Sequence, residues 1–123
     1  MRELKFRAWV YYGEKLKKPH YSQDYDSLSR FFGDHDENDD NQCIEQYTGL
    51  KTRKDGKEIY EGDILQYFAA TLVVEYHDNS FWAVKYDSKE AWNICSFLGV
   101  NGARVIGNIH ENPELLERED GER

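Results

Sequence analysis

The chain of 123 residues is acidic and strongly polar, with 33% charged residues and a net charge of −8. This length fits one domain with at most a small appendage, and 15% aromatic residues argue against global disorder. No apolar run approaches the roughly 20 residues of a membrane-spanning helix, and the charged N-terminus lacks the apolar region that is typical of a signal peptide. We therefore expect a cytoplasmic protein without membrane contact, in which Cys43 and Cys95 stay reduced.

The first 42 residues predict a small N-terminal β/α extension that includes an acidic loop. Over residues 5–12 the side chains alternate between two faces, which predicts a strand. Residues 34–42 are almost purely Asp, Asn and Glu, and such a composition is typical of an exposed, mobile loop.

Capping residues predict two short helices. Asp26 or Ser27 suits the N-cap of a helix that Gly33 would end. Near the C-terminus, Asn112 followed by Pro113 favours the start of a closing helical turn.

Short apolar runs separated by turn residues follow this extension. They predict strands over residues 44–50, 57–60, 64–68, 71–76, 81–86 and 104–109. Asp55-Gly56, between the first two runs, is a strong hairpin signal. This spacing predicts a small β-barrel domain over residues 43–118, followed by a frayed tail over residues 119–123. We expect its core to contain Ile64, Val73, Val84 and Ile106.

The segment from Tyr60 to Ile64 predicts a turn that leads into a strand. Gly62 permits a backbone angle that other residues resist, and Asp63 can accept hydrogen bonds from nearby backbone amides. Turn chemistry therefore accounts for these residue types without a catalytic role.

Three stretches of the sequence resemble the YopX family of phage and prophage proteins. They are Lys5–Trp9, Gln46–Leu50 continued by Lys57–Ile64, and Val105–Pro113. The resemblance implies a mostly β fold, with a C-terminal SH3-like barrel behind the N-terminal extension. It also implies a phage or prophage origin and a bacterial host, and it implies no enzymatic activity.

The sequence contains no recognised catalytic motif and no complete metal site. It has no nucleophile elbow, P-loop or GxGxxG sequence, and its four histidines are scattered. Asp34, Asp36, Asn38 and Glu45 match positions 1, 3, 5 and 12 of a calcium loop, but Asp39 stands where that loop requires glycine. We expect neither enzymatic activity nor a bound cofactor or metal.

The remaining candidates for function are aromatic and basic residues. They are Trp9, Tyr47, Tyr60, Lys51, Arg53, Lys54 and Lys57. Our first hypothesis is a protein-interaction module that binds another phage or host protein, or a second copy of itself, through exposed aromatics and the basic hairpin over residues 51–57.

Two alternatives use the uneven charge of the chain. The basic hairpin beside tyrosines would suit the backbone and bases of a nucleic acid, although the net charge of −8 opposes this. Alternatively, the acidic segment from Asp34 to Asp40 and the acidic tail would occupy the DNA-binding surface of a host enzyme as a decoy.

Overall fold

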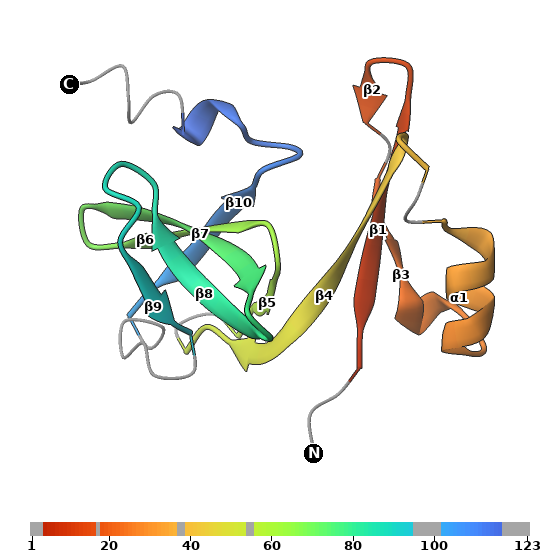
Figure 1. Cartoon of the computed structure of the whole chain (residues 1–123), viewed down its shortest axis with the longest axis horizontal. Coiled ribbons are helices and arrows are strands. Elements are labelled where there is room, and N and C mark those ends of the chain that lie inside the picture. The colour runs from red at the N-terminus through yellow and green to blue at the C-terminus, as the bar shows by residue number, and fades with distance from the viewer. Residues whose placement is uncertain (1–3, 17, 37–38, 54–55, 95–101, 117–123) are drawn as a thin grey trace. The chain divides into compact units, whose positions relative to one another are not determined.

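The computed structural model of the protein describes residues 4–16, 18–36, 39–53, 56–94 and 102–116. Asn38, Lys54, Asp55, Cys95 and the predicted tail over residues 119–123 lie outside these ranges. Within them the structure is mostly β, as expected, and no helix is long and apolar enough to cross a membrane (Figure 1).

The chain divides into two compact units, Met1–Tyr47 and Thr48–Arg123. The division falls inside strand β4 (Gln42–Lys51), whereas the sequence-based expectation places it between residues 42 and 43.

The first unit is a small antiparallel sheet with one α-helix. Strand β1 pairs on one side with the first half of β4 and on the other side with two short strands. The elements are β1 (Phe6–Tyr12), β2 (Lys15–Leu16), β3 (His20–Tyr21), the 3-10 helix η1 (Ser22–Asp24) and α1 (Leu28–Asp34). The strand predicted over residues 5–12 is confirmed.

Helix α1 begins as predicted but ends later. The Ser27 hydroxyl accepts a hydrogen bond from the Arg30 backbone N–H at 3.3 Å, which confirms this residue as the N-cap. The predicted stop at Gly33 is wrong, because the helix continues to Asp34 and His35 is its C-cap. His35 is also buried, so the expectation of a uniformly exposed loop over residues 34–42 is wrong at this position.

The second unit contains a five-stranded antiparallel sheet in the order β10-β6-β7-β8-β9, which curls into a half-barrel (Figure 1). The strands are β6 (Asp63–Tyr67), β7 (Ala70–His77), β8 (Ser80–Lys85), β9 (Ala91–Asn93) and β10 (Arg104–Asn108). A further strand, β5 (Glu58–Tyr60), neighbours β4. All these strands except β9 fall on segments predicted as β from the sequence.

Two hairpins follow the turn chemistry of their residues. Asp78 and Asn79 join β7 to β8 with φ angles of 50° and 63°, the signs that a type I′ turn requires. In the hairpin between β4 and β5, the Thr52 backbone N–H donates to the Lys57 carbonyl at 2.9 Å, and Gly56 adopts a φ of 67°.

The core of the second unit lies on one face of the curled sheet. It contains Ile59, Leu65, Leu72, Val74, Phe81, Ala83, Ile94 and Ala103. The predicted core residues Ile64, Val73 and Val84 are buried but lie in one cross-strand row on the opposite face. The prediction for Ile106 is wrong, because a register shift in β10 between Val105 and Gly107 leaves this side chain half-buried.

Candidate functional site

The segment from Tyr60 to Ile64 forms the tight turn between β5 and β6. Gly62 adopts a φ of 86°, and the Asp63 carboxylate accepts a hydrogen bond from the Tyr60 backbone N–H at 2.8 Å. Gly62 also donates its N–H to the Val74 carbonyl at 2.8 Å and accepts the Ile109 N–H at 2.9 Å. The predicted structural role of the motif is confirmed, because the turn ties strand β7 to the chain that follows β10.

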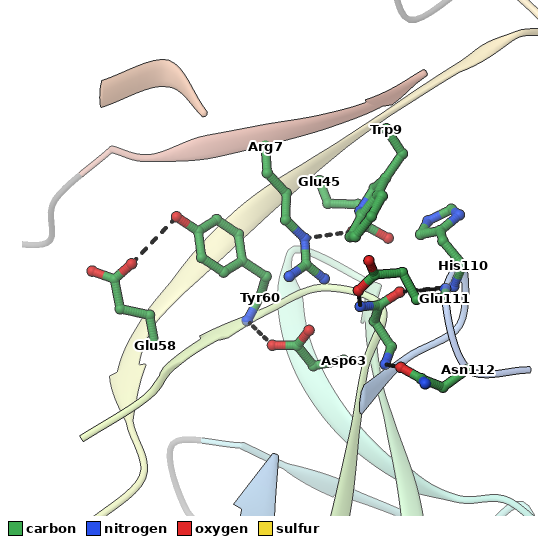
Figure 2. A network of polar contacts seen from close by, with 10 residues as sticks. Arg7, Trp9, Glu45, Glu58, Tyr60, Asp63, His110, Glu111 and Asn112 are labelled. Carbon is green, nitrogen blue, oxygen red and sulfur yellow. Dashed lines mark hydrogen bonds and ion pairs between the residues drawn. The ribbon is translucent and has the colours of Figure 1, made fainter. Parts of the chain in front are cut away.

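A second polar network is built around Asn108 at the end of β10, and Figure 2 labels its partners His110, Glu111 and Asn112. Its side-chain oxygen accepts the backbone N–H groups of His110 at 3.0 Å and Glu111 at 2.8 Å. Its side-chain amide donates to the Glu111 carboxylate at 3.0 Å, and its own backbone N–H donates to the Asn112 side chain at 3.2 Å. One buried side chain therefore organises the whole bend that follows the sheet.

Gly107 is required by the same bend. A Cβ atom at this position would overlap the side chain of Asn112. The Asn112 side chain bonds the Asn108 backbone, so it does not cap the closing helical turn in the way predicted. That turn nevertheless forms, because the Leu115 N–H donates to the Asn112 carbonyl at 3.1 Å.

In the first unit, the cross-strand pair of Arg7 and Glu45 forms a buried ion pair. The Arg7 Nε lies 2.8 Å from Glu45 Oε1, and the Trp9 indole N–H donates to the same oxygen at 2.7 Å (Figure 2). The Arg7 guanidinium also lies 5.2 Å from the centre of the Trp9 ring. Glu45 occupies the twelfth position of the calcium-loop pattern. Its carboxylate is already bonded to the side chains of Arg7 and Trp9, which explains this residue without a calcium ion.

The first unit also brings together two histidines that are distant in sequence. The rings of His20 and His35 lie with their centroids 5.0 Å apart. His35 contacts the Phe31 carbonyl through Nδ1 at 3.0 Å and the Tyr25 hydroxyl through Nε2 at 3.5 Å. Burial, followed by the nearby Asp34 carboxylate, raises the pKa of Tyr25, so this hydroxyl keeps its proton at neutral pH.

The aromatic residues predicted to contact a partner are buried. Trp9 is 1% exposed, and Tyr47 and Tyr60 are each 3% exposed, so the expectation that these rings are available is wrong. Each has a role within its own unit. Trp9 bonds Glu45, Tyr47 lies under the Lys5 ammonium at 5.2 Å, and Tyr60 bonds Glu58 and Asp63.

The predicted basic residues lie on the hairpin between β4 and β5. Lys51, Arg53 and Lys57 are exposed there, while Lys54 is outside the described residues. The hairpin therefore presents basic side chains without the stacking surfaces of Tyr47 and Tyr60 that the nucleic-acid hypothesis includes.

Different apolar side chains are exposed, and sequence reasoning did not select them. In the described part of the chain, the large exposed hydrophobic residues are Leu4, Tyr12, Phe32, Phe68, Tyr76, Trp92 and Ile109. Phe68 is the most exposed of them at 82%. The sequence predicts Phe68 as the last residue of the strand over residues 64–68. The structure instead ends β6 at Tyr67 and places Phe68 in the turn before β7, where its side chain is exposed.

Comparison with known proteins identifies a family and a similar solved structure. Residues 5–117 match the family described as YopX protein. The crystal structure of protein EF1440 from Enterococcus faecalis is 26% identical with a TM-score of 0.58, and the match covers 94% of this chain and 99% of that chain. No curated protein matches. Because the family match extends over nearly the whole sequence, the chain belongs to the YopX protein family.

Proposed function

We propose that this protein is a non-enzymatic protein-interaction module, an accessory protein of a phage or prophage that acts in the bacterial cytoplasm. Its second unit is an SH3-like barrel that carries the contact surface, and its partner is another phage or host protein. Membership of the YopX protein family supports the phage context and the barrel, which the resemblance of the sequence motifs implies.

The observation that carries this proposal is the exposure of aromatic side chains on the second unit. Phe68, Tyr76 and Trp92 are 82%, 44% and 39% exposed, in a chain of which 33% of the residues are charged. Aromatic side chains are enriched in the centres of protein–protein interfaces, where a few of them supply most of the binding free energy. These three residues therefore replace the buried Trp9 and Tyr60 as candidate contacts.

The polar residues of the family motifs support a non-enzymatic role. Asp63 and Asn108 bond backbone groups of the turns in which they lie, and Glu45 bonds Arg7 and Trp9. A catalytic acid or base needs access to a substrate atom, whereas these groups are buried and serve the fold. Their positions in the motifs are explained by the hydrogen bonds they make.

A nucleic-acid-binding function is the second candidate, because the basic side chains of the β4–β5 hairpin are exposed. It would rely on phosphate contacts alone, since Tyr47 and Tyr60 are buried. The acidic-decoy hypothesis would use the acidic segment over residues 34–40. His35 in this segment is buried against Phe31, so the segment is not exposed along its whole length as a decoy surface would need.

An affinity capture from the host bacterium tests the proposal, with and without nuclease treatment. Three forms of the full chain are compared: the wild type, an aromatic variant (Phe68→Ser, Tyr76→Ser and Trp92→Ser), and a hairpin variant (Lys51→Glu, Arg53→Glu and Lys57→Glu). We expect a specific protein that survives nuclease treatment, is retained by the hairpin variant and is lost from the aromatic variant. Loss from the hairpin variant together with nuclease sensitivity would favour the nucleic-acid function instead.

A further inference from the structure

The turn between β6 and β7 has phenylalanine at a position that two-residue hairpins normally fill with glycine. Tyr67 and Ala70 are the last paired residues, so Phe68 and Ala69 form a two-residue turn. Phe68 has a φ of 53°, the sign that the first central position of a type II′ turn requires. Glycine normally occupies that position, because a bulky side chain is strained at positive φ.

The fold gains little from a phenylalanine in this strained position. The ring is 82% exposed, and it meets the Tyr67 ring edge-on at a centroid distance of 4.5 Å. Tyr67 itself packs against the core of the second unit. A strained backbone position therefore carries a large apolar ring that is exposed and not buried in the core, a departure expected at functional sites.

The surroundings of this tip indicate what would receive the ring. The tip itself is apolar, because Phe68 and Ala69 are exposed, Ala70 is half-buried and none of the three carries a charge. The net charge of −8 disfavours both an anionic membrane and a second copy of the same chain. An apolar pocket on a different protein remains the chemically matched recipient.

We propose that Phe68 is the anchor of the interface, inserted from the β6–β7 turn into an apolar pocket of a partner protein. This inference rests on the proposed function and names the residue and the kind of pocket. Because Tyr67 pairs with Ala70 and packs against the core, the backbone that carries the ring is held in place. Such pre-organisation lowers the entropy lost on binding.

Site-specific photocrosslinking in the host tests the inference. Phe68, Tyr76 and Trp92 are replaced one at a time by p-benzoylphenylalanine in the full chain, and the cross-linked peptides are identified by mass spectrometry. We expect an adduct from position 68 with a different protein, at a segment made mainly of apolar residues. With that protein purified, Phe68→Gly should weaken binding about 10-fold or more, the effect of removing an interface hot spot.

The glycine variant also separates binding from folding. Glycine accepts the positive φ without strain, so the melting temperature should stay the same or rise while binding falls. A lower melting temperature together with unchanged binding would overturn the inference and assign Phe68 to folding.

The three crosslinking positions distinguish the two proposals. Adducts with a protein at position 76 or 92 but not at 68 would overturn the anchor and leave the interaction module standing. No protein adduct from any position would overturn both. An adduct from position 68 with lipid, or with a second copy of the chain, would overturn the proposed partner.

Discussion

Asn108 should be essential to the stability of the second unit, because its side chain makes three hydrogen bonds and is buried. Asn108→Ala removes all three and leaves the N–H groups of His110 and Glu111 without this acceptor. At a net 0.5–1.5 kcal/mol for each bond, the expected loss is about 2–4 kcal/mol. For a unit of this size, that loss corresponds to a fall in Tm of about 10 °C or more.

A pair of substitutions separates this network from a simple loss of packing. Asn108→Asp keeps the side-chain oxygen that accepts the His110 and Glu111 N–H groups. It replaces the amide nitrogen, which lies 3.0 Å from the Glu111 carboxylate, with an oxygen, so two carboxylates then face each other. Adding Glu111→Gln supplies a neutral amide in the position of that carboxylate, so the double variant should regain much of the stability lost.

The pH dependence of Asn108→Asp follows from the same geometry. The repulsion exists only while both carboxyl groups are ionised. The destabilisation should therefore be complete at neutral pH and should diminish when acid protonates one of them. Thermal and urea unfolding of the wild type and the variants measure these effects. A change below about 0.5 kcal/mol in Asn108→Ala, the range of an ordinary surface substitution, would refute the reasoning.

Three further predictions concern burial and charge. His35→Ala should destabilise the first unit by about 1–3 kcal/mol in urea unfolding, because it removes a buried ring and its polar contacts; an unchanged midpoint would restore the exposed-loop interpretation. Leu65→Ala should cost about 2–5 kcal/mol and Ile106→Ala distinctly less, since only Leu65 is fully buried in the core; equal losses would contradict the observed core. Fluorescence anisotropy should detect no retention of DNA or RNA oligonucleotides at about 150 mM salt, because the net charge is negative; salt-sensitive binding that the hairpin variant loses would reverse this conclusion.

The sequence was informative wherever local chemistry decides the structure. The strand β1 and the turn made by Gly62 and Asp63 each depend on neighbouring residues and were predicted correctly, and the N-cap was narrowed to Asp26 or Ser27, of which the structure shows Ser27. The end of α1 was not predicted correctly, because His35 packs against Phe31 and extends the helix past Gly33.

The buried face of the curled sheet could not be predicted from periodicity. Ile64 and Leu65 are adjacent and both buried, as are the three consecutive residues from Leu72 to Val74. When neighbouring residues are all apolar, alternation does not identify the face of the strand that meets the core. The register shift near Ile106 adds an irregularity that composition does not signal.

The candidate site depends still more on contacts between distant residues. Trp9 obtains its hydrogen-bond acceptor from Glu45, 36 positions later in the chain, so its burial follows from the pairing of β1 with β4. Phe68 was missed because of its local conformation and not because of a distant contact. It occupies a turn position at which residue preferences predict glycine.

The pairing of β10 with β6 has a consequence for how the protein is made. Asn108 pairs with Asp63 across 45 positions of sequence, while β6, β7 and β8 are joined by two-residue turns. During synthesis these hairpins can form early, but the outer edge of β6 stays uncovered until β10 has left the ribosome. Open edges invite pairing with other chains. A nascent chain stalled before Arg104 should therefore aggregate more readily than the finished protein.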